Sequence, residues 1–180
     1  MNTAFEIGLI VAAVAFMLSA LGIARLRPEK TAAAERFCRA PLLGAVLAAV
    51  ALSLCVPQTE PIAWDWLRGI LWPLVVVFTV LGYLYLDFLT SRAIAGLMIL
   101  GAYYFVNQAF ALRLPTAAIG SVAALALGAA GIWISARPYL LRDFLRRCAA
   151  GIRLRAVAAL ACVAFGWYCA AVAVIMAVRR

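Results

Sequence analysis

Long apolar runs alternate with short polar and basic segments along the whole chain. A transmembrane helix needs about 20 largely apolar residues, and six runs approach or reach that length. Their predicted limits are 5–24, 41–57, 67–86, 93–112, 116–136 and 156–178. The pattern predicts an all-α fold, in which residues 1–180 form one transmembrane domain. This domain is expected to be a six-transmembrane-helix bundle built from three helical hairpins.

Proline positions support these limits. Only Pro73 lies inside a predicted span, in its second turn, where a proline is expected to bend the helix. The other six prolines coincide with predicted boundaries, past a helix end (Pro28, Pro57, Pro61 and Pro138) or at a helix start (Pro41 and Pro115), where the missing N–H costs nothing. The shortest apolar core, Leu42 to Val56, covers only about 22 Å, so the second span is the weakest of the six.

The basic residues predict the orientation of the bundle. The first, third and fifth loops together hold 12 Lys and Arg residues, whereas the other loops and the C-terminus hold four, among them Arg113, Arg179 and Arg180. Loops rich in Lys and Arg stay on the cytoplasmic side. Both termini are therefore expected outside, in the inner (plasma) membrane of a bacterial-type cell. Five crossings would separate the two most basic loops, so six are preferred.

Composition excludes a soluble protein. Hydrophobic residues make up 68% of the 180 residues and charged residues 13%, against about 45–50% and about 25% in soluble domains. The net charge of +9 does not indicate nucleic acid, because the chain has no polar domain that could carry a basic binding face. Membrane lipids, other membrane subunits or a second copy of the chain are the expected partners.

Residues 138–150 form one amphipathic stretch, predicted as a short interfacial helix. Arg142, Asp143, Arg146 and Arg147 take its polar face, which is typical of a helix lying among lipid head groups. The basic residues expected to face lipid or a cytoplasmic partner are Arg142, Arg146, Arg147, Arg153 and Arg155. Such basic residues can also serve only to fix the topology of the chain in the membrane.

Three basic turns resemble one another weakly. Residues 87–96 and 143–151 share Asp-Phe-Leu followed by Arg and a small-residue end, and residues 35–40 keep an acid, an aromatic and an arginine. Duplication of a hairpin would produce this similarity. Chance would also produce it in a chain so rich in Ala and Leu.

Catalytic chemistry is not indicated. The chain lacks histidine and has no phosphate-binding loop or nucleophile motif. Its five cysteines (Cys38, Cys55, Cys148, Cys162 and Cys169) form no CxxC pair and are expected to be small buried apolar residues. No enzyme activity, metal or cofactor is predicted.

Polar groups inside the predicted spans are few. Those that could line an intramembrane binding cleft, or simply join helices by hydrogen bonds, are Tyr103, Tyr104, Asn107, Gln108, Trp167 and Tyr168. No charge lies at mid-membrane, which disfavours an ion-coupled carrier. In the fifth span, Gly120, Ala124 and Gly128, with Gly131 beyond, predict close approach of another helix, in this chain or in another.

These features favour a non-catalytic integral membrane subunit or scaffold of a membrane protein complex. The alternative is a solute- or lipid-binding transport component that uses the polar and aromatic cleft. The residues resemble no known family specifically enough to name one.

Overall fold

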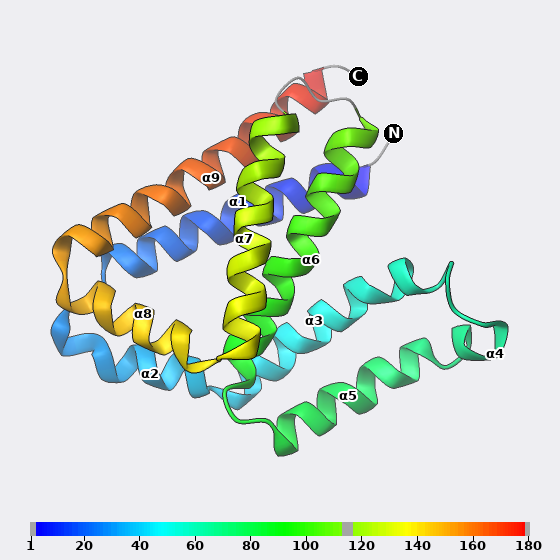
Figure 1. Ribbon diagram of the computed structural model, residues 1–180, viewed down its shortest axis with the longest axis horizontal. Helices are drawn as coiled ribbons and strands as arrows, with labels where there is room; N and C mark the ends of the chain where they lie inside the picture. Colours follow the sequence, from blue (N-terminus) through cyan, green and yellow to red (C-terminus); the bar gives the residue numbers. More distant parts are fainter. Residues whose placement is uncertain (1–2, 113–116, 179–180) are drawn as a thin grey trace. The chain divides into compact units, whose positions relative to one another are not determined.

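The computed structural model describes residues 3–112 and 117–178 (Figure 1). Within these two ranges every regular element is a helix, which confirms the all-α fold class. The elements are α1 (Thr3–Ala24), the 3₁₀ helix η1 (Pro28–Lys30), α2 (Thr31–Arg39), α3 (Pro41–Thr59), α4 (Asp65–Arg68), α5 (Leu71–Tyr85), α6 (Leu89–Ala111), α7 (Ala117–Ala136), α8 (Tyr139–Ala150) and α9 (Ile152–Val178). The predicted features at Arg113, Pro115, Arg179 and Arg180 lie outside the described residues.

Five helices, α1, α3, α6, α7 and α9, are long and apolar enough to cross a membrane. They coincide with five of the six predicted spans and are typical of a multi-pass membrane protein. Pro41 occupies the first position of α3, as predicted, but Pro57 lies inside this helix instead of beyond it. The second span is therefore longer than the sequence suggested, at 19 residues.

The predicted third span, 67–86, is the one that differs. Its beginning is a separate short helix, α4, and the chain turns at Gly69 and Ile70 before α5 begins. Pro73 thus lies in the first turn of α5, where its missing N–H breaks no helical hydrogen bond, and not in the second turn of a longer helix. With 15 residues, α5 is about 22 Å long, short of a hydrocarbon core of about 30 Å. Helix length alone does not confirm a sixth crossing.

The chain divides into two compact units. One consists of Met1–Ala34 and Asp143–Arg180, and the other of Glu35–Arg142. In the first unit α1 packs along α9; in the second, α6 packs against both α7 and α3, and α3 packs against α5 (Figure 1). The expected set of three sequential hairpins is not confirmed, because the first long helix is paired with the last.

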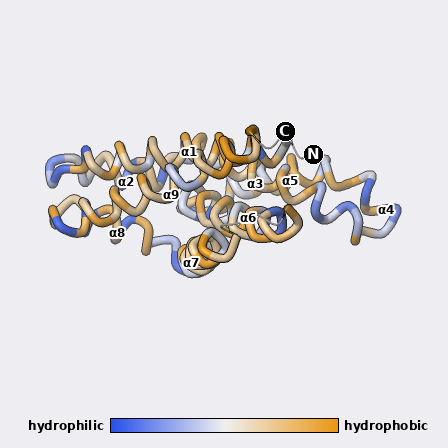
Figure 2. Tube along the Cα trace, turned by 90° about the horizontal axis from the view of Figure 1, so that it is seen from above, coloured by the Kyte–Doolittle hydropathy of each residue, from blue (hydrophilic) through white to orange (hydrophobic). Residues whose placement is uncertain are grey.

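The boundaries between the two units fall within two short amphipathic helices. The predicted interfacial helix 138–150 is present as α8, with Cys148 buried and Arg146 and Arg147 exposed. The second helix, α2, was not predicted; it buries Ala34 and Cys38, four residues apart, on one side. Figure 2 shows hydrophilic residues on α2 and α8 and mainly hydrophobic ones along α1, α7 and α9.

The resemblance among the basic turns does not extend to their structure. Asp87 and Phe88 lie in the loop between α5 and α6, and Phe88 adopts the left-handed conformation with φ of 58°. Asp143 and Phe144 lie instead within α8. The two sequences therefore do not form equivalent elements, and a duplicated hairpin gains no support.

Candidate functional site

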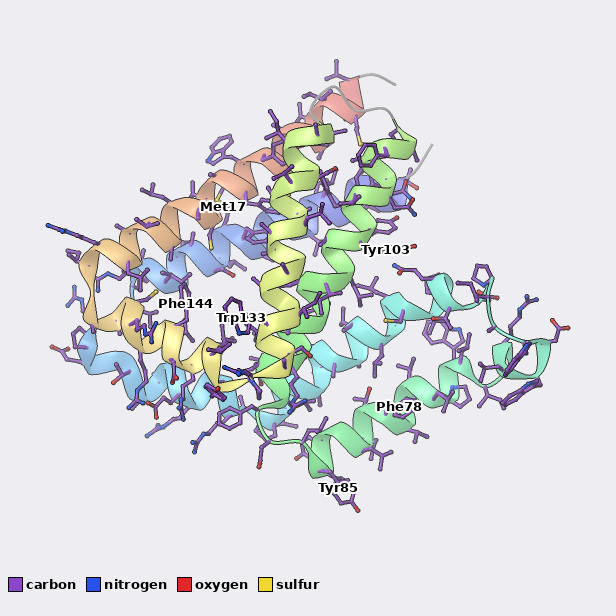
Figure 3. All side chains as sticks on the ribbon, in the orientation of Figure 1. Met17, Phe78, Tyr85, Tyr103, Trp133 and Phe144 are labelled. Carbon is purple, nitrogen blue, oxygen red and sulfur yellow. The ribbon has the colours of Figure 1, made fainter. Side chains whose placement is uncertain are left out.

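The six predicted polar and aromatic residues are divided between the two units. Tyr103, Tyr104, Asn107 and Gln108 are on α6, whereas Trp167 and Tyr168 are on α9. Tyr103 is 56% exposed and projects outward from α6 (Figure 3), and Asn107 beside it is exposed too. Tyr104 and Gln108 are half-buried. Tyr103 and Asn107, four residues apart, therefore lie on an exposed face of α6, whereas Tyr104 and Gln108, also four residues apart, are turned partly inward.

The buried face of α6 consists of other residues, and the small residues of α7 pack against it. Gly128 and Gly131 are both buried. A Cβ atom on Gly128 would lie 3.0 Å from the Cβ of Ala102, and one on Gly131 would lie 2.8 Å from the carbonyl oxygen of Ala95. The predicted close approach along the fifth span thus takes place within the chain, between α7 and α6.

A second close contact joins the start of α3 to the start of α6. The hydroxyl of Thr90, a fully buried residue, donates a hydrogen bond to the carbonyl of Ala40 at 2.8 Å. A Cβ atom on Gly44 would lie 2.7 Å from the backbone nitrogen of Thr90. The guanidinium of Arg39 lies 5.2 Å from the ring centre of Phe88, in cation–π geometry. This contact between α3 and α6 was not predicted, although Gly44 and Thr90 are small or polar residues in apolar surroundings.

The two cysteines outside the long helices are fully buried. Burial raises the pKa of the Cys38 thiol above its ordinary value, against the smaller opposing effects of the Ser91 hydroxyl and Arg142. Burial likewise raises the pKa of Cys148, although the charge of Arg155 acts in the opposite direction. Both thiols are therefore protonated at neutral pH and are poor nucleophiles, in agreement with their predicted packing role.

The cysteines give no support to a metal or disulfide site in the part of the chain that the structure describes. All five are free thiols. Within residues 3–112 and 117–178, no three Cys, Asp or Glu side chains come together as metal ligands. The described residues thus present neither a metal centre nor a redox pair.

The five predicted basic residues have different surroundings. Arg146, Arg147 and Arg153 are exposed, whereas Arg142 and Arg155 are half-buried. The Arg155 guanidinium donates a short hydrogen bond to the carbonyl of Leu26, just beyond the C-terminal end of α1. Arg155 therefore ties the end of α1 to the beginning of α9, which is a structural role rather than a surface one.

We expect Arg155→Gln to lower the free energy of unfolding by about 1–2 kcal/mol, because a hydrogen bond from a charged donor is lost at a half-buried site. Arg153→Gln is the matched control, since Arg153 is exposed two residues away, and it should leave stability unchanged. Denaturant unfolding in detergent micelles, followed by circular dichroism, measures both. Equal stability of the two variants would contradict the structural role of Arg155.

An apolar groove lies along the α1–α9 pair. Gly166 permits the close approach of the helices, since a Cβ there would lie 3.3 Å from the carbonyl oxygen of Ala13. Phe16 and Phe165 pack edge to face beside it, with ring centres 4.7 Å apart. The groove has a volume of about 270 Å³, and the position of Met17 between the two helices is visible in Figure 3. Its lining residues are Ala13, Val14, Met17, Leu18, Gly166, Trp167 and Ala170.

Trp167 is the one residue of the predicted cleft that lines this groove. It is 65% exposed, so its ring forms part of the open side and not an enclosed wall. The groove was not predicted as a site because its residues are apolar and come from opposite ends of the sequence.

No protein-family model matches this chain, and no curated protein or solved structure matches it. A functional proposal therefore depends on the groove, the exposed helix faces and the basic segments described above.

Proposed function

We propose that this protein is a non-catalytic integral membrane subunit or scaffold of a membrane protein complex, in the inner membrane of a bacterial-type cell. The observation that carries this proposal is the large apolar surface left open on the long helices. In α1, for example, Ile7, Val11 and Leu18 are all at least 60% exposed although the helix packs along α9. Exposed apolar helix faces require lipid or the spans of another protein around them.

The small extramembrane part of the chain supports the same role. Apart from α5, the longest regular elements that the structure describes between the long helices are α2 and α8, with only 9 and 12 residues. They hold too little mass to build a soluble domain. Contacts with other proteins are then made through helix faces and through the exposed arginines of the basic segments.

The transport alternative has weaker support. A binding cleft encloses most of its ligand and places polar groups on the inside. Tyr103, Asn107 and Trp167 are exposed instead, so half of the predicted cleft residues face outward. Tyr104, Gln108 and Tyr168 remain as half-buried residues that fit helix-to-helix contact as well as ligand contact.

Our proposal includes six crossings, with α5 as the shortest span and both termini outside. Exposed aromatic residues lie at both ends of α5: Trp66 and Trp72 toward its start, and Tyr83 and Tyr85 at its end. Trp64 stacks on Trp66 with ring centres 6.4 Å apart. Such rings prefer the two interfaces of a bilayer. A short span is accommodated by local thinning of the bilayer at modest cost.

Purification of the native protein in mild detergent, followed by native mass spectrometry, tests this function. A subunit or scaffold is expected to carry other integral membrane proteins in a fixed stoichiometric ratio. The control is the same purification from cells that express the untagged chain. Proteins that appear in this control bind the resin and are disregarded. A monomer that carries a bound small molecule would support the transport alternative and contradict ours.

A further inference from the structure

We propose that the groove between α1 and α9 binds an acyl chain of an anionic phospholipid, whose phosphate is held by arginines at the adjoining ends of these two helices. This proposal goes beyond the role of subunit or scaffold and does not depend on it. Four observations carry it: the chemistry of the groove, its length, the charge beside it and the distance between groove and charge.

The chemistry of the groove suits hydrocarbon. Six of the seven lining residues are wholly apolar, and the indole N–H of Trp167 is the one polar group among the lining side chains. The lining side chains therefore offer no charge and no hydrogen-bond acceptor to a polar ligand. Val14, Leu18 and Trp167 line the groove and are more than half exposed, which leaves it open sideways toward the membrane interior. A ligand that enters from that side is itself apolar along the part that it inserts.

The length of the groove favours a flexible chain over a helix of another protein. Its lining spans residues 13–18 of α1 and 166–170 of α9, which correspond to about 8 Å and about 6 Å along the helices. A packed transmembrane helix is about 10–12 Å wide and makes contact along many turns. A groove of less than two turns suits the end of an acyl chain.

Positive charge gathers at one end of the same helix pair. Arg25 and Arg27 follow the end of α1, and Arg153 lies in the first turn of α9; all three are exposed. Arg155 is already bonded to Leu26 and holds these two ends together. The acidic residues of this end, Glu29 and Asp143, are fewer than the arginines. An anionic phosphate is the head group that such an arrangement favours.

The spacing between groove and arginines matches one leaflet of a bilayer. Arg25 lies seven positions after Leu18, and Gly166 lies thirteen positions after Arg153, which correspond to about 10 Å and about 20 Å of helix. Half of a hydrocarbon core is about 15 Å. A lipid with its phosphate beside Arg25 and Arg153 therefore has the reach to place the end of one chain in the groove.

Native mass spectrometry of the purified protein, with equal amounts of palmitoyl-oleoyl phosphatidylglycerol and phosphatidylcholine, tests the head-group selectivity. We expect phosphatidylglycerol to be retained at least about fivefold over phosphatidylcholine, the factor that one nearby basic residue supplies. The double variant Arg25→Gln, Arg153→Gln should abolish this preference without lowering phosphatidylcholine binding. Equal retention of the two lipids by the unmodified protein would overturn the proposal.

The groove itself is tested by filling it. Ala170→Phe places a ring in the groove and should abolish the selective retention of phosphatidylglycerol, because the ring occupies the space of the acyl chain. Ala164→Phe is the matched control, because Ala164 is an exposed α9 alanine that does not line the groove. Ala170→Leu is a smaller filling change, to be used if circular dichroism shows that the phenylalanine disturbs the fold. Equal retention by the position 170 and position 164 variants would refute the site.

Two further outcomes distinguish other occupants. Competition by millimolar inorganic phosphate would show a simple anion site and overturn the role of the groove. Dimers of the chain that dissociate on Ala170→Phe, with lipid retention unchanged, would show that a second copy occupies the groove and would equally overturn the proposal.

Discussion

Gly44→Ala is expected to lower the free energy of unfolding by about 1–3 kcal/mol, the usual cost of forcing extra volume into a packed interior. The added Cβ would lie 2.7 Å from the backbone nitrogen of Thr90 and 3.0 Å from the carbonyl carbon of Leu89. Because these are backbone atoms, no side-chain rotation relieves the clash. Either α3 moves away from α6, or the bond from the Thr90 hydroxyl to Ala40 is lost. Denaturant unfolding in micelles measures the loss.

Gly131→Ala should act in the same direction on the other side of α6, since its Cβ would lie 2.8 Å from the carbonyl oxygen of Ala95. Gly101→Ala is the matched control on α6 itself, because no atom lies within 4 Å of a Cβ there. Alanine is the better helix former by up to about 1 kcal/mol, so this variant should be as stable as the unmodified protein or more so. A loss of stability at position 101 as large as the loss at position 44 would show that the close contact with Thr90 does not decide the outcome.

The long helices could be predicted because their signal is local. Each needs only a run of apolar residues with charges or prolines at its ends, and five such runs are the long helices of the structure. The short elements were harder to predict. α2 is strongly amphipathic, but its nine residues lie within the first basic loop, where no separate helix was expected. In α5, apolar residues continue from 70 into the helix, and only the turn at Gly69 and Ile70 separates it from α4.

The contacts between helices could not be predicted in the same way. The small residues of α7 predict that another helix approaches closely. They do not indicate which helix this is, because every span offers a similar apolar surface. The contact of Gly44 with Thr90 and the pairing of α1 with α9 join residues that are distant along the chain. The groove at Gly166 depends entirely on that second pairing, so neither composition nor periodicity revealed it.

Cysteines introduced by Lys30→Cys and Arg146→Cys are expected to remain unlabelled when intact cells are treated with a membrane-impermeant thiol reagent, whereas Glu60→Cys should label fully. The physical reason is the cost of moving arginine-rich segments across the membrane, which keeps them on the cytoplasmic side. The five native cysteines must first be replaced, although burial already protects Cys38 and Cys148. The same reagent on opened membranes should label all three positions and serves as the control.

Labelling at position 146 shows whether α5 crosses the membrane. If this helix of 15 residues only enters and leaves the membrane on one side, every later segment changes side, and position 146 becomes accessible from outside while position 30 stays protected. Six crossings place both positions in the cytoplasm. The charge distribution favours six, because five would require the arginines of α8 and of the start of α9 to be translocated. The energetic advantage of keeping those arginines inside is expected to exceed the modest cost of thinning the bilayer around a short α5.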